Sequence, residues 1–309
     1  MGSWTYPATA QPYAYITNQG SDNVSVIDVA TDQVIATIPV GKGPVGIVVS
    51  RARSAAYISN VDGRSISVID TSQNRVIDEI AFDGTPVGLA LAPDDDTLYV
   101  ADWFDDRILA LDTRNPHAPG RSIAIGKAPA GMTLARDGKL LYVANRDSSD
   151  VAVIDTTTLQ IISRIPVGTH PFGLTENSDG TRIYTVNVYS NTLSVIDTDK
   201  RAVIATVAVG DHPYCATLNT DGSRIYVSNT QGDSVSVIDA AAGRSIATIP
   251  VDSVPEGIAY SASNHRIYVA SWGDNTVSVI DANSNKRLAS IPTGKQSRAF
   301  GSFIAAAPH

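Results

Sequence analysis

The chain has 309 residues, of which 43% are hydrophobic and 17% charged, and its formal net charge is −8. This balance predicts a folded core and excludes an intrinsically disordered chain. It argues against nucleic-acid binding, because phosphate backbones select clusters of Lys and Arg, and the sequence contains none. A single cysteine rules out an intramolecular disulfide, and no apolar stretch approaches the roughly 20 residues that span a bilayer. Residues 1–4 lack the charged and apolar regions of a signal peptide, so none is predicted there.

Residues 1–12 form an N-terminal extension outside any repeat, and from residue 13 two patterns recur with one period. The tripeptide Val/Leu-Ile/Leu-Asp and the tyrosine of a Tyr-Ile/Val pattern both return every 42 or 43 residues. The aspartates are Asp28, Asp70, Asp112, Asp155, Asp197, Asp239 and Asp281, and the tyrosines are Tyr15, Tyr57, Tyr99, Tyr142, Tyr184, Tyr226 and Tyr268. Two independent patterns in one register establish seven units.

Each unit reads as four short strands separated by turn residues. In one unit we expect strands at 215–219, 224–228, 234–239 and 245–251, rich in Val, Ile, Tyr and Thr. Seven four-stranded units of this length predict an all-β, seven-bladed β-propeller with antiparallel strands in each blade. No segment shows the period of a helix over a useful length.

The two ends of the repeat region are out of phase in a way that predicts ring closure. The region opens with a second-type strand at 13–17 and ends with a first-type strand at 299–304. The C-terminal strand is therefore expected to join the N-terminal blade and complete it, which leaves only short, protected edges. The predicted organisation is one domain at 13–304 and a tail at 305–309.

Several motifs resemble the YVTN family of β-propeller repeats. They are Tyr-Val-Ala-Asn (142–145), Tyr-Val-Ser-Asn (226–229), Ser-Val-Ser-Val-Ile-Asp (234–239), Ile-Pro-Val-Gly (165–168) and the closing segment 297–304. The resemblance implies the seven-bladed fold over residues 13–304. It also implies a periplasmic or secreted protein if a leader has been removed, and a cytoplasmic one otherwise. Because this family and its wider relatives include binding proteins, lactonases, a lyase and dehydrogenase subunits, the resemblance does not single out a function.

Residues present in all seven units are expected to build blades. The seven aspartates end the third strand and are predicted to accept hydrogen bonds from backbone amides of the next turn. The seven tyrosines are predicted to pack between blades. The asparagines that end most second strands are interpreted as turn residues.

The residues that depart from the repeat are the candidates for function. By analogy with other propellers, a ligand is expected at the channel mouth, where loops enter the first strands. His170 and His212 precede a proline at identical positions in adjacent units, and Glu256 follows the proline of the next unit. Two imidazoles and a carboxylate suit a divalent metal such as zinc, or an acid/base pair. The alternative is a pair of loop histidines on a solvated rim.

Two further residues have competing interpretations. Arg298, which takes the position of Glu256 in the closing unit, either binds a ligand or forms a structural ion pair with Glu256. Cys215 is either a nucleophile beside His212 or a small buried hydrophobic residue.

Aromatic residues gather in the same loops. Trp and Tyr that are presented in loops are typical of contact surfaces, although they also pack over the blade below. The predicted ligand-binding residues are Trp103, Phe172, Tyr189, Tyr214, Trp272 and Arg298.

The sequence leaves two functions open. One is a binding module that holds a small molecule or a protein partner at the channel mouth, with no cofactor required. The other is a lyase or hydrolase that uses His170, His212 and Glu256, with or without a divalent metal.

Overall fold

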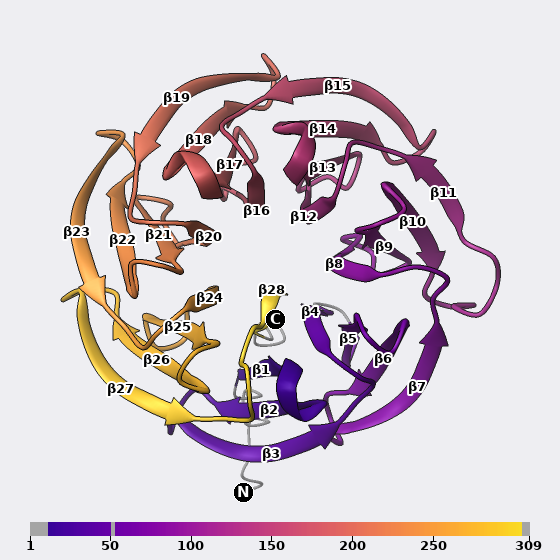
Figure 1. Cartoon of the computed structure of the whole chain (residues 1–309), viewed down its shortest axis with the longest axis horizontal. Helices are drawn as coiled ribbons and strands as arrows, with labels where there is room; N and C mark the ends of the chain where they lie inside the picture. The colour runs from indigo at the N-terminus through magenta and orange to yellow at the C-terminus, as the bar shows by residue number, and fades with distance from the viewer. Residues whose placement is uncertain (1–11, 51–52, 305–309) are drawn as a thin grey trace, which may run out of the picture.

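A computed structural model describes residues 12–50 and 53–304 of the chain. In these residues, seven sheets stand as blades around a central channel, which confirms the predicted seven-bladed propeller (Figure 1). Their strands are antiparallel except for one short strand near the C-terminus. No helix in these ranges is long and apolar enough to cross a membrane. The predicted extension at 1–12, apart from Pro12, and the predicted tail at 305–309 lie outside the described residues.

The blades are numbered here in chain order. The first three contain β1 (Tyr13–Asn18), β2 (Asn23–Asp28) and β3 (Gln33–Pro39); β4 (Pro44–Val49), β5 (Ala55–Asn60), β6 (Ser65–Asp70) and β7 (Arg75–Ala81); and β8 (Pro86–Leu91), β9 (Thr97–Asp102), β10 (Arg107–Asp112) and β11 (Arg121–Ala124). The fourth and fifth contain β12 (Pro129–Leu134), β13 (Leu140–Asn145), β14 (Asp150–Asp155) and β15 (Gln160–Pro166); and β16 (Pro171–Glu176), β17 (Arg182–Asn187), β18 (Thr192–Asp197) and β19 (Ala202–Ala208).

The sixth and seventh blades contain β20 (Pro213–Leu218), β21 (Arg224–Asn229), β22 (Ser234–Asp239) and β23 (Arg244–Pro250); and β24 (Pro255–Ser261), β25 (Arg266–Ser271), β26 (Thr276–Asp281) and β27 (Lys286–Pro292). The last strand in the described residues is β28 (Phe300–Ser302). Short 3-10 turns η1 (Gln19–Ser21), η2 (Arg146–Ser148) and η3 (Val188–Ser190) join second to third strands. The strands predicted for the sixth blade agree with the structure to within two residues.

The repeated residues hold the blades together as expected. All seven tyrosines are buried, and the hydroxyl of Tyr15 donates to the Thr71 carbonyl oxygen of the next blade at 3.3 Å. The Tyr268 hydroxyl likewise donates to the Val29 carbonyl oxygen at 3.0 Å, across the seam between the last blade and the first. The repeated aspartates cap turns: Asp28 accepts a hydrogen bond from the amide of Ala30 at 2.8 Å.

The asparagines that end the second strands have a different role from the one predicted. Asn60 and its equivalents are fully buried rather than placed in the turn. The Asn60 amide donates to the hydroxyls of Ser65 and Ser67 on the neighbouring third strand, at 3.0 and 2.9 Å. These asparagines therefore fix the second strand to the third within each blade.

Ring closure occurs where it was predicted, but its geometry differs from that of an ordinary first strand. The C-terminal segment bridges to β1 only at Asn18↔Ser297 and Ala14↔Ile304. Between these two bridges the C-terminal segment advances by seven residues, while β1 advances by four. In the second blade, the first strand advances by only five residues, from Pro44 to Val49, while β5 advances by four. The two extra residues let β28 swing into the channel and pair in parallel with β4 (Figure 1).

Candidate functional site

The two ends of the channel are formed by different loops. The connection face carries the loops that enter the first strands and those that join second to third strands. The hairpin face carries the tight turns between first and second strands. The strands β4, β8, β12, β16, β20 and β24 each begin with a proline at the connection face and run along the channel to the hairpin face.

At the connection face, the side chains of the residues that follow these prolines fill the channel. In the closing segment, Ser297 stands in place of the proline, and Arg298 follows it. We call these side chains and Phe300 the plug, which consists of Val45, Val87, Ala130, Phe172, Tyr214, Glu256, Arg298 and Phe300. Its apolar members other than Tyr214 are at most 8% exposed and belong to one hydrophobic cluster. The ring centroid of Phe172 lies 4.3 Å from that of Tyr214 and 4.9 Å from that of Phe300. The aromatic rings thus pack across the channel and close this end.

The charged members of the plug form a buried ion pair. The Arg298 Nη2 donates to Glu256 Oε1 at 2.9 Å, and its Nε lies 2.7 Å from Oε2. The Glu256 side chain is only 5% exposed, and burial raises the pKa of this carboxyl more than Arg298 lowers it. The ion pair that the sequence suggested between Glu256 and Arg298 is thus present in the structure. The carboxylate is therefore engaged within the channel.

The two histidines lie outside the plug on either side of Tyr189. The His170 ring centroid is 4.3 Å from that of Tyr189, and the His212 centroid is 5.4 Å from it, both in edge contacts. Each imidazole also lies near an aspartate, His170 at 3.6 Å from Asp147 and His212 at 2.8 Å from Asp211. In the described part of the chain, no group of three or more His, Cys, Asp or Glu side chains could hold a metal ion. The structure therefore does not assemble the histidines and Glu256 into one metal-binding cluster.

The backbone explains why histidine suits these two positions. His170 and His212 have φ of 55° and 52°, in the left-handed region that histidine tolerates better than most residues. Ala128 and Val254 adopt the same conformation before their prolines, with φ of 51° and 53°. The amide of His212 donates to Asn191 Oδ1 of the preceding blade at 2.9 Å. The position is thus a blade-to-blade contact in several blades, whichever side chain it carries.

The remaining predicted ligand residues form an outer surface at the connection face. Tyr189 is 57% exposed, and the Arg146 guanidinium lies 5.8 Å from its ring centroid and 5.8 Å from that of half-buried Trp103. Trp272 lines a separate, shallow pocket of about 390 Å³ with Gly20 and Lys295 among its other walls. The predicted ligand set thus divides into plug residues and surface residues that do not share one cavity.

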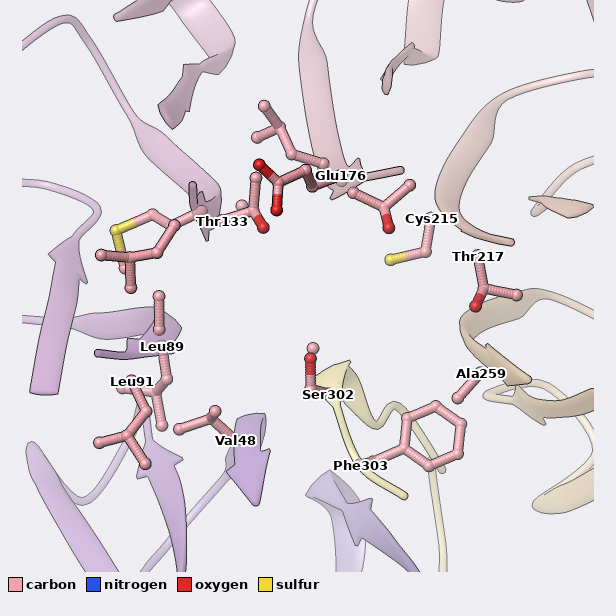
Figure 2. Close-up of a pocket in the computed structure, with 18 of the residues that line it drawn as sticks. Val48, Leu89, Leu91, Thr133, Glu176, Cys215, Thr217, Ala259, Ser302 and Phe303 are labelled. Atoms are coloured by element: carbon pink, nitrogen blue, oxygen red, sulfur yellow. The ribbon is translucent and has the colours of Figure 1, made fainter. Parts of the chain in front are cut away.

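The principal cavity lies on the other side of the plug. It has a volume of about 670 Å³, and Phe300 and Cys215 belong both to its lining and to the plug's hydrophobic cluster. From there the lining follows the first strands to the turns of the hairpin face, including Pro93 and Ser178. Figure 2 shows side chains from several blades around this open space. The sequence patterns described above did not predict this cavity.

A signal for the cavity does exist in the sequence. The fifth residue of the first strand is threonine in three consecutive blades, Thr133, Thr175 and Thr217, whereas other blades have Val48, Ala90 or Ala259 there. All three threonines line the cavity. An uninterrupted run of polar residues at one inner register can therefore mark one wall of a channel.

Cys215 lies in the cavity wall as a buried thiol (Figure 2). Burial, and to a lesser degree the charge of Glu256, raise its pKa well above the usual range of a thiol. The thiol is therefore protonated near neutral pH and lacks the thiolate that a nucleophile requires. This favours the interpretation of Cys215 as a small buried residue.

The fold and the site define a seven-bladed propeller with one end of its channel closed and a cavity toward the other. The family model "Lactonase, 7-bladed beta-propeller" matches residues 8–160 and 112–203, which together are more than half of the chain. The chain therefore belongs to this family of propellers. The YVTN-type repeat is a finer assignment that stays a prediction. A search of curated proteins finds no match.

Solved structures share the fold at low sequence identity. Hydrazine synthase of Kuenenia stuttgartiensis is 22% identical, with a TM-score of 0.74 over 82% of this chain and 88% of that chain. A protein of unknown function from Desulfotomaculum acetoxidans DSM 771 is 14% identical, with a TM-score of 0.80 over 94% and 99%. Dihydro-heme d1 dehydrogenase NirN, solved in complex with DHE, is 14% identical, with a TM-score of 0.72 over 94% and 75%.

Proposed function

We propose that this protein binds a small molecule in the channel cavity, which the ligand enters from the hairpin face. The observation that carries the proposal is the cavity of about 670 Å³, within the range typical of small-molecule sites. The plug supplies a closed inner end, and rigid strands supply the walls. The fold neighbour NirN, solved with bound DHE, gives one example of a propeller-containing chain with a small molecule.

The proposal places the ligand away from the mouth that the sequence favoured. Phe172, Tyr214 and Arg298 pack against other plug residues, so most of the contacts that they could offer a ligand are already made within the plug. Tyr189 and Trp103 remain available for a protein partner, but neither is among the described residues that line the channel cavity.

The test is a screen of small molecules by ligand-observed NMR, followed by calorimetry on each hit. Ala259→Phe fills the cavity from its wall and is expected to abolish binding. Tyr189→Ala is the matched control, because it removes an exposed ring from the connection face without touching the cavity. Loss of binding in Tyr189→Ala and retention in Ala259→Phe would move the site to the connection face and refute the proposal.

A second candidate function is the hydrolysis of a lactone in the same cavity, which the family match favours. Glu176 is a carboxylate in the cavity wall, and a carboxylate can serve as the general base that activates water. Hydrolysis of a panel of neutral γ- and δ-lactones should then be measurable by pH-stat and lost in Glu176→Gln. Wild-type protein that binds lactones without turnover would leave binding as the function.

A further inference from the structure

The turn η3 places an aromatic ring in a recess between loops of the connection face. The Tyr189 amide donates to the carbonyl oxygen of Thr169 at 3.2 Å, and the amide before it donates to that of His170 at 3.0 Å. These two bonds dock the turn on the loop that enters β16. The Tyr189 ring centroid then lies 4.3 Å from that of the His170 imidazole and 5.8 Å from the Arg146 guanidinium of the preceding blade. The chain itself therefore fills this recess with a ring.

The turn η1 docks on the closing segment in the same way. The Gly20 amide donates to the carbonyl oxygen of Lys295 at 2.9 Å, and the amide before it donates to that of Gln296 at 3.0 Å. Gly20 therefore occupies the position of Tyr189, and Gln296 occupies that of His170. Because glycine has no side chain, the same recess is open at this second place.

The open recess is the shallow pocket of about 390 Å³ at the connection face. Trp272 lines it from the position that Arg146 takes beside Tyr189, and the Trp272 Nε1 is buried, so that edge of the indole lies inside the protein. Lys295 and Gln296 also line the pocket. Within residues 12–50 and 53–304, neither the Lys295 ammonium group nor the side-chain amide of Gln296 has a hydrogen-bond or ion-pair partner. The recess thus combines an aromatic wall with free polar groups.

We propose that this recess binds a small aromatic molecule with an oxygen substituent, a phenol or a close relative, in the place that Tyr189 fills at the equivalent loops. The aromatic ring packs against Trp272, because aromatic pairs attract beyond the area that they bury. The oxygen is hydrogen-bonded by the Gln296 amide or the Lys295 ammonium group, both of which are donors. A volume of about 390 Å³ is at the small end of the range for ligand pockets and suits a single ring. This site is separate from the channel cavity and does not depend on the function proposed for it.

The probe that tests the site is p-cresol, which is the tyrosine side chain without its backbone. A titration of the full chain by ligand-observed NMR and calorimetry should show one equivalent bound, with a Kd on the order of 1 mM because the recess is shallow. Methylcyclohexanol has a similar size but no aromatic ring and should bind about fivefold more weakly. Methyl glucoside, which tests whether the recess prefers a sugar, should also bind more weakly than p-cresol.

Two variants remove the site by different means. Gly20→Tyr gives η1 the side chain that η3 carries, so it should fill the recess and abolish p-cresol binding. The three atoms nearest to a Cβ at Gly20 would belong to the Gln296 side chain, the closest of them Oε1 at 2.7 Å, and this flexible side chain can move. Trp272→Ala removes the aromatic wall and should weaken binding about tenfold.

Two further variants serve as matched controls. Tyr189→Ala opens the equivalent recess and should add a second equivalent of bound p-cresol. Ala259→Phe fills the channel cavity, and it should leave the affinity for p-cresol within about twofold because the two sites are separate. The result for this variant therefore distinguishes the recess from the ligand site proposed in the channel.

The proposal is overturned if the wild type does not bind p-cresol, or if methyl glucoside binds more tightly than p-cresol. Unchanged affinity in Trp272→Ala or in a folded Gly20→Tyr would overturn it as well. If Gly20→Tyr does not fold, Trp272→Ala and Tyr189→Ala decide the matter. Binding of one equivalent by Tyr189→Ala would then show that the two recesses are not equivalent, and the assignment of a ring to the open one would fall.

Discussion

The two ends of the channel are built from the same strands and have opposite properties. At the connection face the residues after the prolines meet across the channel, and Phe300 from the C-terminal segment packs among them. Toward the hairpin face the same strands surround a cavity of about 670 Å³. The difference comes from side-chain size at two registers. One contains Phe172 and Tyr214, and the other contains threonine, alanine and valine.

If the proposed function is right, this contrast separates residues that vary for packing from residues that vary for binding. At the connection face, variation between blades produces complementary shapes and one ion pair, so the most unusual residues there stabilise the ring. At the hairpin face, variation produces walls of different polarity around an open space. A departure from the repeat is therefore evidence of function only when the side chain reaches a cavity.

The largest effect is expected from opening the plug. Phe300→Ala removes a ring that is 3% exposed and packs on Phe172 and Tyr214, so it should lower the free energy of unfolding by about 3–5 kcal/mol. Phe104→Ala is the control, because that ring is 76% exposed and its removal should cost less than about 0.5 kcal/mol. Urea denaturation measures both. Equal costs for the two variants would show that Phe300 does not close the channel.

The second effect concerns the ion pair within the plug. Arg298→Ala leaves the Glu256 carboxylate buried without its cation, and the loss should be about 3 kcal/mol near pH 7. Arg64→Ala breaks a pair whose side chains are 61% and 98% exposed, and its cost should stay below about 1 kcal/mol. Denaturation of both variants tests whether burial sets the value of the pair.

The pH dependence of that loss has a definite sign. Burial raises the pKa of Glu256 in the folded protein above its usual value of 4.5, so the folded state holds this proton more tightly than the unfolded state. The resulting stabilisation is complete below pH 4.5 and is lost as the pH rises through the folded pKa. Removing Arg298 raises that pKa further. The variant should therefore lose more stability at about pH 8 than at about pH 5, and an equal loss at both would contradict a buried, unpaired carboxylate.

The fold was predictable because its signals repeat seven times. Tyr268 and Asp28 are each one of seven equivalent residues, and a single register suffices to place them between blades and in turns. The Glu256–Arg298 pair was also foreseeable, since both residues follow the loop that enters a first strand in adjacent units. The closing segment was harder, because the displacement of β28 toward β4 depends on two extra residues that no other blade contains.

The cavity could not be located from the same patterns. Whether Thr217 or Tyr214 faces open space depends on how seven side chains fill the channel at each level, which is a property of the assembled ring. The repeat reveals the registers, but it does not reveal that the rings of Phe172 and Phe300 meet within the channel. The sequence patterns therefore pointed to the connection face and not to the row of threonines, Thr133, Thr175 and Thr217.

A smaller effect is expected from the contacts between blades at the connection face. Asn191, at φ 52°, accepts the amide of His212 at 2.9 Å, and Asn191→Ala should cost about 1 kcal/mol. Ser149 has the same left-handed conformation, with φ 54°, but in the described part of the chain its hydroxyl makes no equivalent bond. Ser149→Ala therefore controls for the backbone conformation alone. Thermal or urea denaturation that gave equal costs would remove the hydrogen bond from the explanation.

The smallest effect is expected from His170, one of the two histidines that the sequence singled out as candidates for function. Asparagine also tolerates the left-handed conformation, so His170→Asn should change stability by less than about 0.5 kcal/mol near pH 7. Burial, and then Arg146, lower the pKa of this imidazole below its usual 6.5, although Asp147 opposes them. A histidine with a lowered folded pKa contributes stability above pH 6.5 and loses it as the pH falls through the folded value. The variant lacks this loss, so its stability relative to the wild type should improve between about pH 7 and pH 5.

Ligand binding in the channel should be unaffected, because His170 lies beside Tyr189 at the connection face, beyond the plug. If calorimetry instead showed that His170→Asn abolishes binding while Ala259→Phe does not, function would belong to the connection face and the contrast between the two ends would have to be reversed.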